Sequence, residues 1–260
     1  MIPNLTIGDL MIDCYHASRA RDFYADLMGW EKIIAFDCLA LTTDNGLTIL
    51  FAETDVPYVP PIWPETPGRQ QKQMHLDFLV DELPSAVEKA IHLGAVKAAA
   101  QYGDEWFVTM MDLEGHPFCL CQRPQTKSEF DLYYERKGYG AIPNISVNID
   151  CKKSETLRAF YAELTEWDRY FHPTALIGEN RMVIHFMECD FDYIPPVWPE
   201  QPGEQQKQMH FNFQVDNLQF AVEEAIRLGA AKAAEQYGGE HFVTLLDTEG
   251  HPFCLCKRGK

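Results

Sequence analysis

The sequence predicts an α+β protein in which four βαβββ modules pair into two curved mixed sheets, with the helices on the convex faces. Three observations predict this class. The chain repeats itself, because residues 55–121 recur at an offset of 135. Each copy contains two runs in which one helix-like segment follows a strand and precedes three more strands. One such run has too little apolar surface to close a core, whereas two side by side can form a curved sheet.

The repeat also sets the domain organisation. We expect a first domain over residues 1–122, a linker over 123–141 and a second domain over 142–260. The linker is polar and shows no hydrophobic period. The first halves of the copies, "DCYHASRARDFYADLMGW" and "DCKKSETLRAFYAELTEW", align at an offset of 137, so a two-residue length change precedes Asp55.

The elements of the first copy follow from the period of its apolar residues. Alternation predicts strands, and an apolar stripe at helical spacing that ends at a glycine predicts a helix. In chain order, we expect a strand at 8–14, a helix at 17–28 ended by Gly29, strands at 31–36, 38–43, 47–53 and 75–80, a helix at 83–93 closed by Gly94, and strands at 96–102, 105–111 and 117–121.

Strand alternation then predicts which side chains line the concave faces. Apolar residues such as Leu10 and Phe78 suit the helix side. The opposite side carries polar groups on a mostly apolar wall, which is typical of a small-molecule site, so each copy is expected to offer one groove. The expected groove residues are Asp9, Asp13, Glu53, Trp63, His75, Asp77, Cys119, Asp150, Glu188, Trp198, His210, Asn212 and Cys254.

Composition excludes several classes of partner. A net charge of -17 and a pI near 4.8 disfavour nucleic-acid phosphates and anionic lipid surfaces. No segment has the length of a membrane helix, and the first residues do not resemble a signal peptide. The eight cysteines lie partly in strand-like runs such as "FCLC", which indicates reduced thiols in a cytoplasmic protein. The expected partner is a small molecule, and a homo-oligomer is compatible with the sequence.

The order of elements, the helix signature "RDFYADLMGW" and the ending "DLEGHPFCL" together resemble the vicinal oxygen chelate superfamily. This superfamily includes glyoxalase I, fosfomycin- and bleomycin-resistance proteins and extradiol dioxygenases. The resemblance covers both copies and implies two tandem glyoxalase-like domains. It also implies, for the metal-dependent members, a divalent ion held by side chains at set strand positions.

Carried over by position, that ligand set is incomplete. The resemblance places a histidine at His75 and His210, but the first-strand position falls on Asp9 and Ser146 and the last-strand glutamate on Cys119 and Cys254. Glu53 and Glu188 lie near a fourth position, so the metal-ligand candidates are His75, Glu53, His210 and Glu188. A divalent ion needs about three converging donors. A divalent metal is therefore the one cofactor considered, and no catalytic residue is assigned.

The expected function is that of a glyoxalase/bleomycin-resistance-like protein that binds a small organic ligand in a groove of each domain, with metal-dependent catalysis doubtful. The alternative is a metal-dependent lyase, isomerase or dioxygenase that uses His75 or His210 with Glu53 or Glu188. A third reading is that the duplication serves assembly and the grooves are vestigial.

Three local features have more than one interpretation. Asp13 and Asp150 either face the groove or approach a helix N-terminus. Glu53 and Glu188 either accept a proton in the groove or are solvated at a strand end. The repeated loop "PPIWPETPGRQQKQMH" and "PPVWPEQPGEQQKQMH", with Trp63 or Trp198, is a ligand platform, a plug or an interface between the copies.

Overall fold

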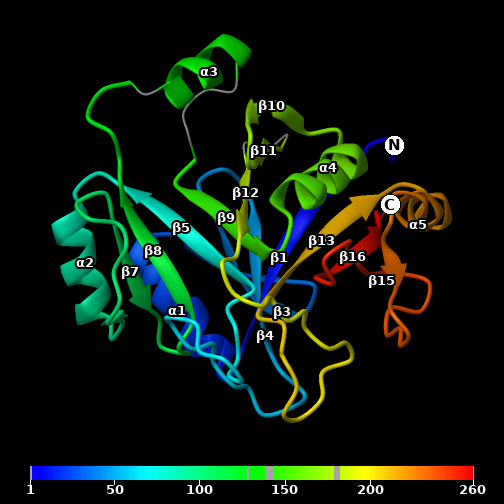
Figure 1. Ribbon diagram of the computed structural model, residues 1–260, viewed down its shortest axis with the longest axis horizontal. Helices are drawn as coiled ribbons and strands as arrows, with labels where there is room; N and C mark the ends of the chain where they lie inside the picture. The colour runs from blue at the N-terminus through cyan, green and yellow to red at the C-terminus, as the bar shows by residue number, and fades with distance from the viewer. Residues whose placement is uncertain (1, 128, 139–142, 179–181, 260) are drawn as a thin grey trace.

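Two eight-stranded mixed sheets form the fold in the computed structural model, which describes residues 2–127, 129–138, 143–178 and 182–259 (Figure 1). The predicted fold class is confirmed. The first copy contains β1 (Thr6–Cys14), α1 (Ala17–Met28), β2 (Glu31–Ala35), β3 (Cys38–Thr42), β4 (Thr48–Glu53), β5 (Met74–Val80), α2 (Leu83–His92), β6 (Val96–Lys97), β7 (Phe107–Met111) and β8 (Pro117–Gln122). The β6 strand is shorter than the alternation predicted.

The second copy repeats these elements. It contains β9 (Ile145–Cys151), α4 (Ser154–Thr165), β10 (Asp168–His172), β11 (Ala175–Ile177), β12 (Val183–Glu188), β13 (Met209–Val215), α5 (Leu218–Arg227), β14 (Ala231–Lys232), β15 (Phe242–Leu246) and β16 (Pro252–Lys257). The segment predicted as an aperiodic linker contains one further helix, α3 (Glu129–Lys137).

Each sheet is shared between the two copies. Sheet A has the strand order β14-β15-β16-β13-β1-β4-β3-β2, and sheet B has the order β10-β11-β12-β9-β5-β8-β7-β6. The antiparallel junctions are β1 with β13 and β5 with β9. The expectation that each copy forms a groove of its own is therefore wrong. Because β5 and β13 share four of their seven residues and the same apolar face, strand pattern alone does not distinguish pairing within a copy from pairing across copies.

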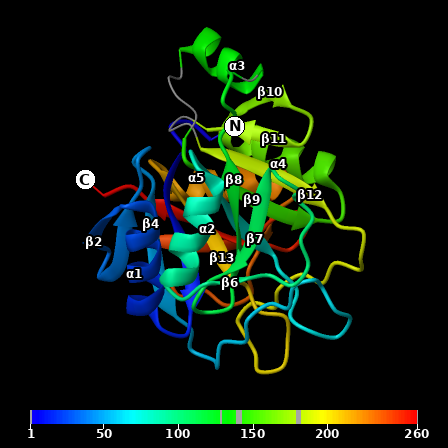
Figure 2. The same ribbon diagram turned by 90° about the vertical axis from the view of Figure 1, so that its left-hand side faces the viewer.

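The core nevertheless joins the two modules of one copy. Tyr24 of α1 is buried and its ring lies 6.1 Å from Phe51 in sheet A, 5.7 Å from Phe78 and 6.0 Å from Phe118 in sheet B, between ring centroids. The helix side of each strand thus faces the core, as predicted, and the concave sides face away from it. Figure 2 shows α1 and α2 lying against the strands of their own copy.

The segment "DLEGHPF", part of the motif on which the resemblance rests, forms a turn that Asp112 stabilises. Asp112 accepts hydrogen bonds from the Tyr24 hydroxyl at 2.7 Å and from the backbone N–H groups of Glu114 and His116 at 2.8 Å each. Gly115 has a φ of 81°, and an added Cβ would lie 2.7 Å from Pro60 Cβ. A glycine is required there because the turn packs directly on the proline-rich loop.

The two proline-rich loops bind each other. Gln205 accepts from the Gln71 N–H at 2.8 Å and donates to the Gln71 carbonyl at 2.9 Å, and Gln208 accepts from the Gln73 N–H at 2.9 Å. The loops run side by side at the bottom of Figures 1 and 2. The glutamines of the repeated motif are therefore an interface between the copies. Within the described ranges, no helix has both the length and the apolar character needed to cross a bilayer.

Candidate functional site

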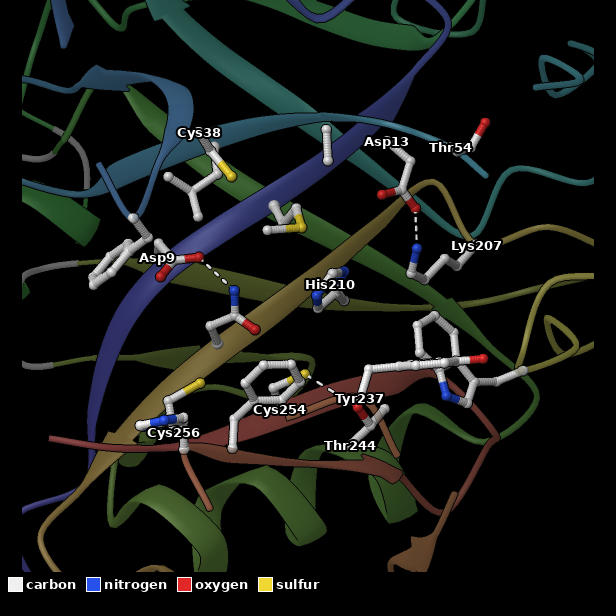
Figure 3. Close-up of a pocket in the computed structure, with 18 of the residues that line it drawn as sticks. Asp9, Asp13, Cys38, Thr54, Lys207, His210, Tyr237, Thr244, Cys254 and Cys256 are labelled. Atoms are coloured by element: carbon white, nitrogen blue, oxygen red, sulfur yellow. Dashed lines mark hydrogen bonds and ion pairs between the residues drawn. The ribbon is translucent and has the colours of Figure 1, made fainter. Parts of the chain in front are cut away.

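The concave face of sheet A contains a cavity of about 800 Å³ (Figure 3). This size is within the range of small-molecule sites. Its lining combines both copies, because β1, β3 and β4 come from the first and β13, β15 and β16 from the second. The sequence-predicted groove residues that line it are Asp9, Asp13, Glu53, Trp198, His210, Asn212 and Cys254.

A buried ion pair closes one end of this cavity. Lys207 binds Asp13 and donates to Glu200 Oε1 at 3.1 Å, and its Nζ lies 5.0 Å from the ring centroid of Trp198. Burial alone would lower the pKa of Lys207, but the Asp13 and Glu200 carboxylates outweigh burial and raise that pKa above its usual value. Lys207 is therefore an ammonium at neutral pH, with two carboxylates beside it.

The middle of the cavity is polar but uncharged. Figure 3 shows His210 on β13 between Asp9 and Asp13 of the neighbouring β1. Burial, and then the Lys207 charge, lowers the His210 pKa to about 3, so its imidazole is neutral. Cys254 is buried, its Sγ lies 3.5 Å from Thr244 Oγ1, and burial raises its pKa to about 11. The wall here offers a neutral imidazole and a protonated thiol.

Asp9 stands at the other end of the cavity. Asp9 is only 4% exposed, and Asn212 Nδ2 donates a hydrogen bond to Asp9 Oδ1 at 2.6 Å. Burial raises the Asp9 pKa to about 6, and the Asn212 hydrogen bond acts in the opposite direction. The two ends of the cavity therefore differ, since one carboxylate faces an ammonium and the other faces an amide.

The concave face of sheet B brings together a different set of predicted residues. His75 Nε2 lies 3.4 Å from Asp77 Oδ1, and ligand atoms of His75, Asp77 and Cys119 all lie within 4.8 Å of one another. One imidazole, one carboxylate and one thiol are donors that suit a borderline ion such as Zn²⁺. In sheet A the position of Asp77 is taken by Asn212, and the described residues there form no comparable group.

The ion pair is repeated at sheet B. Lys72 binds Asp150, its Nζ lies 3.9 Å from Glu65 Oε1, and Trp63 lies with its ring centroid 5.4 Å from that nitrogen. Asp13 and Asp150 thus bind buried lysines of the proline-rich loops. Each lysine comes from the copy that does not contain its aspartate, so the two pairs tie the copies together.

Part of the concave face of sheet B is covered by the linker helix. Alternation places Ala175, Ile177 and Val183 on that face, and all three are buried in a small cluster against Tyr133 of α3. In sheet A the position of Ala175 is taken by Cys38, which lines the open cavity. Figure 1 shows α3 above β10 and β11, at the end of sheet B. The grooves are therefore unequal.

Glu53 and Glu188 lie at helix N-termini. Glu53 Oε1 accepts from the Ala17 N–H at 3.3 Å, and Glu188 Oε2 accepts from the Ser154 N–H at 3.3 Å and the Ser154 hydroxyl at 3.1 Å. Negative groups are favourable at this end of a helix. Because the sheets are shared, Glu53 borders the groove of His210, and Glu188 belongs to the sheet that holds His75. The pairings His75 with Glu53 and His210 with Glu188 are not formed.

Sequence reasoning did not find Lys72, Lys207 or Phe36. Lys207 and Phe36 line the cavity, and Lys72 has the equivalent place in sheet B. A lysine between glutamines is expected to be solvated. The repetition of "QQKQMH" in both copies was the one feature of the sequence that pointed to a role for it. The eight cysteines, all within the described ranges, are free thiols.

Comparisons with known proteins were consistent with this architecture. The family model described as a glyoxalase-like domain matches residues 9–121 and again residues 146–256. No curated protein sequence is significantly similar to the chain. The solved structure of glyoxalase I from Zea mays is similar with a TM-score of 0.60 at 12% identity, covering 98% of this chain and 92% of that one.

A second similar structure is a Bacillus subtilis protein assigned provisionally as a dioxygenase. Its TM-score is 0.56 at 11% identity, and the match covers 98% of this chain and 86% of that chain. At such low identity, both structures support the fold alone.

Proposed function

This chain belongs to the glyoxalase-like domain family of the vicinal oxygen chelate superfamily, with one family domain in each copy, and from that premise we propose that it binds a small organic molecule in the cavity of sheet A. The observation that carries the proposal is the cavity of about 800 Å³ that β1 and β13 form together. A cavity of this size encloses a small organic molecule, and a few polar groups on an apolar wall fix its orientation.

The chemistry of the wall supports binding without a metal ion at this sheet. Asn212 stands where the other sheet has Asp77, so a neutral amide replaces a carboxylate. An amide is a weaker ligand for a divalent ion than a carboxylate. His210, neutral at pH 7, is suited to a hydrogen bond with a bound molecule.

A matched pair of variants tests which groove binds. Cys254 and Cys119 occupy equivalent strand positions, are each 6% exposed and each contact a threonine hydroxyl. We expect Cys254→Phe to weaken a ligand found by fragment screening by about tenfold or more, which is about 1.4 kcal/mol. Cys119→Phe should leave that affinity unchanged. Isothermal titration calorimetry on both folded variants measures the difference, and equal loss in the two would contradict the assignment to sheet A.

A second candidate function is a metal centre in sheet B, favoured by the cluster of His75, Asp77 and Cys119. His75 Nδ1 is buried without a hydrogen-bond partner among the described residues, so the imidazole is not committed elsewhere. These three side chains would hold the ion, with the thiol of Cys119 deprotonated by coordination. A bound zinc ion would supply a Lewis acid.

Cobalt binding tests this candidate independently of any activity. We expect one Co²⁺ per chain in the unmodified protein, with a thiolate-to-cobalt absorption band that Cys119→Ser removes. Cys254→Ser, at the equivalent position in sheet A, should leave the band intact. Absence of cobalt uptake in the unmodified protein, or the same loss in both variants, would rule out the centre.

A further inference from the structure

Asp9 is a buried carboxylate without a cationic partner. Its one hydrogen bond comes from the Asn212 amide, and no described lysine, arginine or histidine forms an ion pair with it. Asp13, four residues along the same strand, shows the contrast, because Lys207 neutralises it. A carboxylate removed from water and left without a counter-charge is unfavourable. A positive group from outside the chain would relieve that cost.

The charged side chains that line the cavity are mostly negative, like Asp9. Five carboxylates line it, against the ammonium groups of Lys207 and Lys257. Of these ammonium groups, the Lys207 charge is already matched by two of the carboxylates. A cavity lined by one sign of charge raises the local concentration of ions of the other sign. The five carboxylates are those of Asp9, Asp13, Glu53, Asp55 and Glu200.

An exposed aromatic ring lies near the Asp9 end. Phe36 lines the cavity, is 68% exposed, and has a φ of 51° in the two-residue turn between β2 and β3. A bulky residue in the left-handed region is rare and is retained where other interactions require it. Cys38, two residues further on, lies close enough to Asp9 for that carboxylate to raise its pKa, and Figure 3 shows both residues on the left of the cavity. An aromatic face near a carboxylate is a suitable site for a cationic nitrogen.

The second copy lacks both parts of this arrangement. Ser146 stands at the position of Asp9, and Pro173 at the position of Phe36. The unpaired carboxylate and the exposed ring are therefore present in sheet A, and the equivalent positions of sheet B have neither.

Resting on the function proposed above, we propose that the cavity of sheet A selects small organic molecules with one cationic nitrogen, received by the Asp9 carboxylate beside Phe36, and an apolar body. The apolar body lies against Met11, Leu50 and Phe242, which are apolar side chains of the cavity wall. A charged hydrogen bond of this kind contributes more than a neutral one.

Three matched series of fragments test the charge preference. Each series has the same body, indol-3-yl, phenyl or cyclohexyl, carrying in turn an ethylamine, an ethanol or an acetic acid chain. We expect the best-binding body to favour its amine over its alcohol by about tenfold or more at pH 7.5, and its acid to bind weakest. Calorimetry and ligand-observed NMR on the full chain measure the three affinities.

Variants of Asp9 separate this inference from general binding. Asp9→Asn, and Asp9→Ser which copies the second domain, should abolish the preference for the amine while the alcohol still binds. Asp26→Asn removes the same charge from the exposed surface of α1 and should leave the preference unchanged. Amine and alcohol binding equally in the unmodified protein, or a preference that survives in Asp9→Asn, overturns the inference alone. Failure of all nine fragments to bind overturns the proposed function as well.

The preference should also depend on pH. The titratable groups around Asp9 are Cys38 of β3, His210 of β13 and Cys254, Cys256 and Lys257 of β16, and Asp37 lies close enough to Cys38 to act on it. Burial raises the three thiol pKa values and lowers the His210 pKa, so all four stay neutral from pH 5 to 7.5. Asp9 at this end of the cavity and Asp13 beside Lys207 both have pKa values raised to about 6 and both lose charge on acidification, so the preference for the amine should fall at pH 5. A preference unchanged at pH 5 contradicts the role of Asp9.

Discussion

Replacing Lys207 by methionine is expected to lower the free energy of unfolding by about 3–5 kcal/mol at pH 7.5. The variant leaves Asp13 and Glu200 buried without their ammonium partner. Burial already raises the Asp13 pKa to about 6 in the intact pair. Without Lys207 that pKa rises further. The cost then grows with pH from the ordinary aspartate value of 3.8 up to the raised folded value, because over this range the carboxyl is ionised in the unfolded chain but protonated in the folded one. Urea denaturation at pH 7.5 and pH 5 measures both effects, with the smaller loss expected at pH 5.

Two controls separate the unpaired charge from lost packing. The double variant Lys207→Met with Asp13→Leu should recover a large part of the stability, because an apolar pair replaces a buried ion pair at little cost. Lys127→Met removes a lysine from an exposed pair with Glu135 and should change stability by about 1 kcal/mol or less. A loss in Lys207→Met no larger than that of Lys127→Met would mean that the buried pair does not stabilise the fold.

An isolated first copy, residues 1–122, is expected to form a dimer and not a folded monomer. In the full chain the edge of β1 pairs with β13, and the edge of β5 pairs with β9. Since β13 and β9 are the equivalents of β5 and β1, a second first copy supplies both missing partners by two-fold symmetry. Light scattering with circular dichroism measures mass and folding together, and a folded monomer would contradict the shared-sheet topology.

The strength of that dimer should depend on one carboxylate pair. Asp9 lies opposite Asn212 in the full chain, but in a dimer of first copies it would lie opposite Asp77. Two neighbouring buried carboxylates repel each other, so Asp77→Asn should tighten the dimer at pH 7.5. The isolated second copy, residues 142–260, places Ser146 opposite Asn212 and should need no such change. Dimers of equal affinity with and without Asp77→Asn would show that the register differs.

The faces of the strands could be predicted from the sequence, whereas the strand partners could not. The period of two fixed Leu10 and Phe78 on the core side and Asp9 and His75 on the concave side, since one face had to be buried. The choice between partners depends on the loops, where Gln71 and Gln205 bind across copies. Glutamine hydrogen bonds of this kind leave no hydrophobic period in a sequence.

Of the candidate site, the residues on strands could be predicted from the sequence, whereas Lys207 of the loop could not. Residues on strands, such as His210 and Cys254, were placed in a groove because their position on a strand determines where they point. Lys207 was missed because its burial depends on Asp13, which comes from the other copy. The covering of sheet B by Tyr133 depends on a segment without a hydrophobic pattern. Cytoplasmic location and self-association stay predictions.

The strand orders of the two sheets also have a consequence for synthesis on the ribosome. Every strand of sheet B lies between residues 74 and 188, whereas sheet A joins strands before residue 54 to strands after residue 208. The nascent chain can therefore complete sheet B while β1 still has an unpaired edge. That edge stays unpaired until β13 has left the exit tunnel, so the cavity of sheet A forms last, and a premature stop before β13 prevents it from forming.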